Sequence, residues 1–402
     1  MDKNNGAIYD ARKLGKPKMI ILGVQHMFAM FGATILVPIL TGLDISTTLL
    51  MAGLGTLLFH CITKFKVPAF LGSSFAFLGG YAAIKAFSPN DPNSMLPYAC
   101  LGVACAGLIY FILAAVIKAV GIEKVMRFFP PVVTGPIIIA IGLGLAPSAV
   151  SNCTTNWFLA VVALAVIVVF NIWGKGMAKI IPIILGLLIS YGTGLVLYFI
   201  SQANPDLIQN VPWLFSGGAD ANGVYQPIFD FTSLNTICDN ISKGHIFGSE
   251  GLIGIPIHWD KTVFGGIDYS NGALIASSII AIVPIAFATM MEHIGDICAI
   301  SSTTGNNYIK DPGLHRTLVG DGLATTLASL FGGPANTTYG ENTGVLALTR
   351  VYDPRVIRIA AYFAVAVSFF PIVSVIIGSI PSCIIGGISF VLYGMISAIG
   401  VR

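Results

Sequence analysis

Three acidic side chains lie inside apolar stretches that are long enough to cross a membrane. Glu292 and Asp296 stand in "MMEHIGDICAI", and Glu341 stands in "NTTYGENTGVLAL". An ionisable group at the centre of a bilayer costs about 3 kcal/mol or more, so such a group usually faces a polar cavity. The three acids therefore predict a pathway for an ion or a polar substrate.

The spacing of Glu292 and Asp296 predicts proton chemistry. Residues four apart share one face of a helix, and two poorly solvated carboxylates at that distance cannot both ionise cheaply. One of them should hold a proton more readily than it would in water. We expect Glu292, Asp296 and Glu341 to couple transport to protons, with no other cofactor. A plain structural role stays open for each acid, most of all for Asp296.

Composition assigns the chain to the polytopic membrane proteins. Hydrophobic residues make up 55% and charged residues 10% of the 402 residues, whereas soluble domains carry about 25% charged residues. Apolar runs near the spanning length of about 20 residues predict an all-α membrane protein with twelve spans, divided by a polar stretch at 202–270. The runs lie at 19–41, 48–63, 68–84, 97–118, 132–150, 157–173, 180–201, 272–295, 318–332, 335–349, 356–379 and 384–401.

Loop charges predict the orientation. With the N-terminus in the cytoplasm, nearly all Lys and Arg residues fall on the inner side, and Lys85, Lys243 and Lys261 fall outside. Cytoplasmic loops carry such an excess of basic residues, which favours a multi-pass protein of the cell (inner or plasma) membrane. The basic residues are spread over many loops, so they do not indicate nucleic-acid binding.

Short motifs recur in the two halves of the chain at nearly constant spacing. They pair Gln25-His26 with Glu292-His293, Gly53 and Gly55 with Gly320 and Gly322, Pro68-Ala69 with Pro334-Ala335, and Pro130 and Gly135 with Pro381 and Gly386. Seven spans separate the copies, and an odd number predicts an inverted repeat, as in secondary transporters. The second copy lacks counterparts of the sixth and seventh spans, which predicts a truncated or incomplete sequence.

The third and tenth apolar segments are interrupted by Gly and Pro in matching places. Such interrupted segments are the best sequence pointer to a transporter site. Ser73–Phe75 and Thr337–Tyr339 favour extended backbone, so we expect a short strand in each segment, followed by a half-helix that starts near Glu341 or Asn342 in the tenth. The two strands should meet with backbone groups left unpaired around a cavity, where irregular backbone is tolerated in a membrane.

Several of the candidate residues could also have a purely structural role. His26 and His293 could be polar contacts between helices, whereas Phe75 and Tyr339 beside a broken backbone favour cavity lining. The seven cysteines have no spacing typical of a metal site, and a disulfide between Cys153 and Cys238 is left open. No HExxH, GxSxG or GxxxxGK[ST] motif is present, so the pattern is not typical of an enzyme or an ATP-driven pump.

The motifs "PAFLGSSFAF", "KDPGLHR" and "TTYGENTGVLALTR" resemble those of the nucleobase–ascorbate transporter family, in particular its bacterial uracil permeases. The family's tenth-segment signature is met by Glu341, Asn342, Gly344, Thr349 and Arg350. "QHMFAMFGATILVP" and "MEHIGD" look like the family's first and eighth spans. The resemblance covers nearly the whole chain outside 202–270.

The resemblance implies fourteen spans, seven plus seven inverted, with a core domain that moves against a gate domain. It implies proton-coupled uptake, often by a homodimer. Placed on this chain, the divisions are a cytoplasmic N-terminus at 1–18, core at 19–118, gate at 119–201, an extracytoplasmic insertion at 202–270, core at 271–379 and an incomplete gate part at 380–402.

The resemblance also implies roles for single residues. Glu292 and Glu341 would hydrogen-bond the base, and the backbone around Phe75, Tyr339 and Gly340 would contact it. The supporting residues would be His26, Asn342 and Ser74.

Two family signals conflict over the substrate. Uracil members usually carry His where this chain has Asp296, whereas purine members usually carry Gln where it has Glu341. We weight Glu341 more heavily because it should touch the ligand. The expectation is therefore import of uracil, with xanthine or urate as the alternative. An anion carrier of the same fold is the less favoured reading, because an acid beside a helix N-terminus would repel its ligand.

Overall fold

The computed structural model describes residues 7–121, 124, 131–220 and 222–401, and it is mostly helical. The chain forms two compact units. Unit 1 comprises Met1–Thr134 and Gly254–Pro371, and unit 2 comprises Gly135–Ile253 and Ile372–Arg402. The polar stretch 202–270 is thus divided between the two units.

The helices of unit 1 follow the apolar runs closely. Their ends lie where Gly, Asp or Pro interrupts the run, as at Gly42, which adopts the left-handed conformation after α1, and at Asp44, which caps α2. The bounds are α1 Lys16–Thr41, α2 Ile45–Ile62, α3 Leu78–Lys85, α4 Leu96–Val120, α12 Val263–Gly266, α13 Gly272–Ile282, α14 Ala286–Thr304, α15 Leu314–Leu330, α16 Gly340–Thr349 and α17 Pro354–Ser368.

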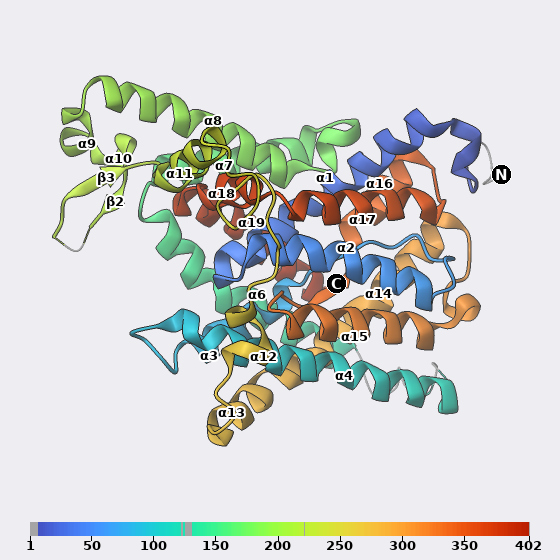
Figure 1. The fold of residues 1–402 in the computed structure, drawn as a ribbon. Coiled ribbons are helices and arrows are strands. Elements are labelled where there is room, and N and C mark those ends of the chain that lie inside the picture. Colours follow the sequence, from blue (N-terminus) through green and yellow to red (C-terminus); the bar gives the residue numbers. More distant parts are fainter. Residues whose placement is uncertain (1–6, 122–123, 125–130, 221, 402) are drawn as a thin grey trace. The chain divides into compact units, whose positions relative to one another are not determined.

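Within unit 1, α17, α2, α15 and α4 lie side by side in that order (Figure 1). Glycines permit the close approach. A Cβ at Gly53 in α2 would lie 2.7 Å from the carbonyl oxygen of Ala361 in α17, and one at Gly322 in α15 would lie 2.5 Å from the carbonyl oxygen of Gly107 in α4. Helix backbones can approach this closely only where side chains are absent.

Adding one methyl group at Gly322 is expected to destabilise the protein. Gly322→Ala places a Cβ against the Gly107 carbonyl and the Tyr110 side chain, and overpacking of this kind costs about 1–3 kcal/mol. Thermal unfolding in detergent measures the effect. The control is Gly192→Ala in a helix of unit 2, where a Cβ would meet nothing within 4 Å. Equal melting temperatures for the two variants would contradict the packing argument.

Two short strands meet at the centre of unit 1. β1 (Leu71–Ser73) pairs antiparallel with β4 (Asn336–Thr338), with Leu71 opposite Thr338 and Ser73 opposite Asn336. Helical turns follow both strands, at η2 (Phe75–Phe77) and α3 after β1 and at α16 after β4. Each interrupted segment therefore contains the strand and half-helix that the sequence predicts, with the strands beginning one or two residues earlier than expected.

The expectation of unpaired strand backbone is wrong for these residues. The antiparallel ladder is extended by Ser74 N–H to the Ala335 carbonyl and Tyr339 N–H to the Phe70 carbonyl, both at 3.0 Å. Side chains of the flanking helices add further partners: Thr56 accepts from Leu71 N–H at 2.9 Å, and Thr325 donates to the Asn336 carbonyl at 2.9 Å. Buried backbone groups are paired because leaving them unpaired is costly.

Unit 2 packs α7 against α8 and α19. In its polar segment the rings of Phe229 and Phe231 stack at 5.2 Å, and both contact the ring of Tyr198 in α8. Cys153 is buried and Cys238 is exposed, and both are free thiols, so the disulfide left open by the sequence is not formed. The bounds are α6 Pro131–Cys153, α7 Trp157–Trp173, α8 Pro182–Ala203, α9 Asp206–Asn210, α10 Pro212–Phe215, β2 Ser216–Ala219, β3 Tyr225–Pro227, α11 Thr232–Ser242, α18 Pro371–Gly378 and α19 Ser382–Val401.

By length and composition, five helices in the described part of the chain can cross a membrane, or six if the bent pair Pro354–Ser368 and Pro371–Gly378 is one span. Shorter apolar helices such as Trp157–Trp173 fall below that length. The structure thus supports a polytopic membrane protein, whereas the number twelve stays a prediction.

Candidate functional site

The predicted acids Glu292 and Asp296 lie one turn apart on α14. This helix begins at Ala286, directly after a short turn that contains Pro284. The Glu292 side chain is exposed and the Asp296 side chain is half-buried, whereas His293 between them is fully buried. α14 therefore presents its acids on one face and inserts its histidine into the interior of unit 1.

Thr338, the last residue of β4, joins α14 to the crossing strands. Its hydroxyl donates to Oδ2 of Asp296 at 3.1 Å and lies 3.1 Å from Nδ1 of His293. Because the hydroxyl proton is given to Asp296, the hydroxyl oxygen accepts from His293, which places a proton on Nδ1. One threonine hydroxyl thus contacts both the half-buried Asp296 carboxylate and the buried His293 ring and fixes their positions relative to β4.

Asp321 in α15 completes this network, although the sequence reasoning did not select it. Its side chain is fully buried. Oδ1 accepts from the backbone N–H of Thr338 at 2.8 Å, and Oδ2 lies 3.5 Å from Nδ1 of His293. The signal that could have found Asp321 is the one that selected Glu292, because it too is an acid inside an apolar run, in "LVGDGLATTLASL".

Asp296 also faces the start of α16. A Cβ at Gly340, the first residue of α16, would lie 3.1 Å from Oδ1 of Asp296. Tyr339 is the N-cap residue in extended conformation, and its side chain makes no cap hydrogen bond. The N-terminus of a helix carries partial positive charge, so a carboxylate at this position is stabilised. Glu341 lies in the first turn of α16, and its side chain is outside the described residues.

The two expected aromatic residues follow the two strands. The Tyr339 ring is buried, and a Cβ at Gly72 in β1 would lie 2.8 Å from its ring atoms. This close contact explains why β1 carries a glycine opposite β4. Phe75 lies in η2 and is half-buried. Contact of either residue with a ligand stays a prediction.

The supporting residues His26 and Asn342 contact each other. Nδ1 of His26 lies 3.1 Å from Oδ1 of Asn342, and an amide oxygen can only accept, so His26 donates. The contact fastens α1 to the first turn of α16. Nε2 of His26 and Nδ2 of Asn342 are buried and have no partner among the described residues, which suits an ordered water. The third supporting residue, Ser74, is buried beside β1.

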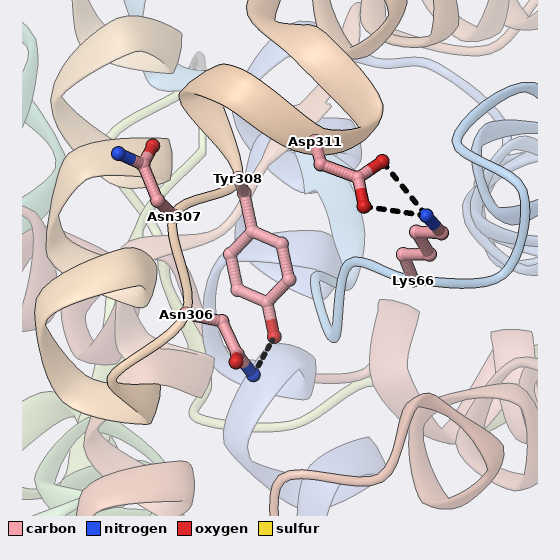
Figure 2. Close-up of a pocket in the computed structure, with 5 residues that line it drawn as sticks. All are labelled: Lys66, Asn306, Asn307, Tyr308 and Asp311. Atoms are coloured by element: carbon pink, nitrogen blue, oxygen red, sulfur yellow. Dashed lines mark hydrogen bonds and ion pairs between the residues drawn. The ribbon is translucent and has the colours of Figure 1, made fainter.

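A separate polar pocket of about 300 Å³ opens elsewhere on unit 1 (Figure 2). It is lined by Lys66, Asn306, Asn307, Tyr308 and Asp311. Lys66 Nζ donates to both carboxylate oxygens of Asp311, at 2.7 and 2.6 Å, and Asn306 donates to the Tyr308 hydroxyl at 3.2 Å. None of the predicted site residues lines this pocket, so it is distinct from the α14–α16 site.

Proteins similar to this chain support the family resemblance of its motifs. A uracil permease of Bacillus caldolyticus is 38% identical over 394 residues, which cover 95% of this chain and 78% of that protein. A uracil permease of Escherichia coli (strain K12) is 31% identical over 394 residues, again 95% of this chain and 78% of the relative. A solved structure, the transmembrane domain of a cyanobacterium bicarbonate transporter, shares the fold with a TM-score of 0.60 at 14% identity, covering 97% of this chain and 90% of that one.

The model of a permease family matches residues 17–402, nearly the whole chain. Together with the uracil permease relatives, this match makes the protein a multi-pass membrane transporter and not an enzyme. The chain belongs to this permease family, the nucleobase–ascorbate transporters.

Proposed function

We propose that the protein is a nucleobase:proton symporter that imports uracil across the cell membrane. The observation that carries the proposal is the meeting of Asp296, Thr338 and Gly340, which brings the acid-bearing face of α14 to the N-terminus of α16. A planar base with amide-like edges needs both donors and acceptors. This arrangement offers carboxylates from α14 and backbone N–H groups from the first turn of α16.

In this proposal Glu292 binds the imide edge of the base, and Glu341 with the amides near Gly340 binds the other edge. Phe75 and Tyr339 contact the ring faces. Glu292, Asp296 and Glu341 exchange the coupling proton, and His26, Asn342 and Ser74 support the site. The names of the uracil permease relatives favour uracil, and Asp296 keeps a purine such as xanthine as the alternative.

The proposed transport cycle uses an inverted 7+7 repeat, with core and gate domains that move against each other. The helix pairing within unit 1 supports the repeat. In that scheme α2 and α15 are the matching second and ninth spans, and α4 and α17 are the matching fourth and eleventh. Each of the first pair packs through a glycine on the fourth-position span of the other copy: α2 packs on α17, and α15 packs on α4. The proposal includes a cytoplasmic N-terminus, a surrounding bilayer and a homodimer.

Competition during uptake tests the substrate. Cells without their own uracil uptake, expressing the protein, are expected to accumulate labelled uracil, with unlabelled uracil competing at least about tenfold better than xanthine. Each tenfold ratio reflects about 1.4 kcal/mol of binding. Stronger competition by xanthine would show that the protein prefers purines. A melting temperature raised by sulfate, and by neither base, would indicate an anion carrier.

A further inference from the structure

Residues 8–14, directly before α1, form a segment that we call the N-terminal strap. Its backbone pairs with the chain just after α16: Ile8 N–H donates to the Arg350 carbonyl at 2.9 Å, and Tyr352 N–H donates to the Ile8 carbonyl at 2.8 Å. The dark blue N-terminal end lies beside α16 and α17 in Figure 1. The strap therefore holds the C-terminal end of the half-helix whose N-terminal end forms the candidate site.

Tyr9 of the same strap contacts the C-terminal end of α14. Its hydroxyl donates to the carbonyl of Thr304, the last residue of α14, at 2.6 Å. Its ring meets the Tyr352 ring edge-on at 5.5 Å. The last carbonyls of a helix have no partner within the helix, so the Tyr9 hydroxyl satisfies a group that otherwise needs an external donor.

The strap also binds the first turn of α17. Oδ2 of Asp353, the N-cap residue of α17, accepts from Ala11 N–H at 2.7 Å, and Arg355 donates to Asp10 at 3.0 Å. Hydrogen bonds from Arg12 hold the pKa of the Asp10 carboxyl well below its ordinary value, so Asp10 stays charged at neutral pH. Beneath these contacts lies a small apolar cluster of Ala11, Val351 and Val356 with Ile8, Leu14, Met19 and Leu22.

The contacts of the strap hold one end of a short helix, α16. α16 has ten residues, about 15 Å at 1.5 Å per residue. A tilt of about 4° at its strapped end therefore moves its first residues by about 1 Å. Gly340 stands at that other end, beside Asp296 of α14. A misplacement of this size is large for a site that binds through directed hydrogen bonds.

We propose that the N-terminal strap is a positioning element for the substrate site. By fixing the ends of α14 and α16 to one another, it sets the spacing between Asp296 and the N-terminus of α16, and with it the affinity for substrate. The identity of that substrate rests on the proposed function. The strap itself touches none of the candidate ligand-binding residues in the described contacts.

The test replaces Tyr9 with Phe, which keeps the ring contact with Tyr352 and removes the hydrogen bond to Thr304. Tyr352→Phe is the matched control, because the structure gives its hydroxyl no hydrogen bond among the described residues. The first readout is amide hydrogen exchange of 340–349 without substrate, and the second is the KM and maximal rate of uracil uptake. Tyr9→Ala, which also removes the ring, extends the series.

For Tyr9→Phe we expect faster exchange in α16 and a KM raised about threefold to tenfold, the amount that one ordinary hydrogen bond supplies. The maximal rate and the melting temperature should change little, and Tyr9→Ala should shift KM further. Tyr352→Phe should leave both readouts unchanged. A strap that served stability alone would lower the melting temperature and leave KM as it was.

Unchanged exchange in α16 for both Tyr9 variants would overturn the proposal, and so would faster exchange with an unaltered KM. If the unsubstituted protein neither binds nor transports uracil, the proposed function fails instead. Even then the exchange comparison decides by itself whether residues 8–14 hold α16.

Discussion

Asp321→Ala is expected to destabilise the protein by about 3 kcal/mol and to abolish uptake. The substitution removes a fully buried carboxylate that accepts from Thr338 N–H and faces Nδ1 of His293. A buried donor left without its acceptor costs about 1–3 kcal/mol, and more when the lost partner is charged. The Thr338 N–H loses its acceptor here, and Thr338 is the residue whose hydroxyl binds Asp296. Thermal unfolding in detergent and uracil uptake measure the two effects.

Asp311→Ala is the control for Asp321→Ala, since it also removes an aspartate of unit 1. Asp311 pairs with Lys66, and both side chains are largely exposed, so the pair contributes about 1 kcal/mol or less. Asp321→Asn retains an acceptor for Thr338 N–H and should lie between Asp321→Ala and the unsubstituted protein. If Asp321→Ala melts like Asp311→Ala, the buried network does not hold the strand.

Glu292→Ala is expected to abolish uracil uptake without loss of stability. The side chain is exposed on α14, so its removal leaves no cavity, and we propose that it binds the substrate. A hydrogen bond to a charged group contributes about 1.5–3 kcal/mol, so loss of Glu292 should weaken binding at least about tenfold. Uptake of labelled uracil and the rise in melting temperature on adding uracil measure this change.

Glu250→Ala is the matched control, because Glu250 is likewise an exposed glutamate and is not among the candidate site residues. It should transport and bind as the unsubstituted protein does. Glu292→Gln separates two roles: it keeps hydrogen-bonding groups and loses the exchangeable charge, so it should retain some binding while accumulation against a gradient is lost. Full uptake by Glu292→Ala would end the assignment of Glu292 to the substrate.

Part of the site could be read from local sequence. Gly and Pro in "VPAFLGSSF" and "GGPANTTYG" disfavour a continuous helix, and the β-branched Thr337 and Thr338 favour strand. The structure has β1 and β4 at these places. His26 and Asn342, which the family resemblance makes supporting residues, lie in contact.

Other parts could not be read in this way. His60 stands at the end of an apolar run, which is typical of an interfacial residue, yet it is fully buried and its Nε2 lies 2.9 Å from the Ala69 carbonyl. The hydrogen-bonded pairing of β1 with β4 and the role of Asp321 also could not be predicted from local sequence. Each depends on a partner whose position follows from packing and not from neighbouring residues.

The sequence by itself determined that this chain is a membrane transporter, which family it belongs to and where its helices break, because hydropathy, Gly and Pro placement and the "YGENTG" motif act over a few residues. Tertiary structure alone decided that Thr338 joins Asp296, His293 and Asp321. It alone placed Tyr9 on Thr304, 295 residues away. Such contacts require helices to approach at particular angles and depths, and those are set by the packing of whole helix surfaces.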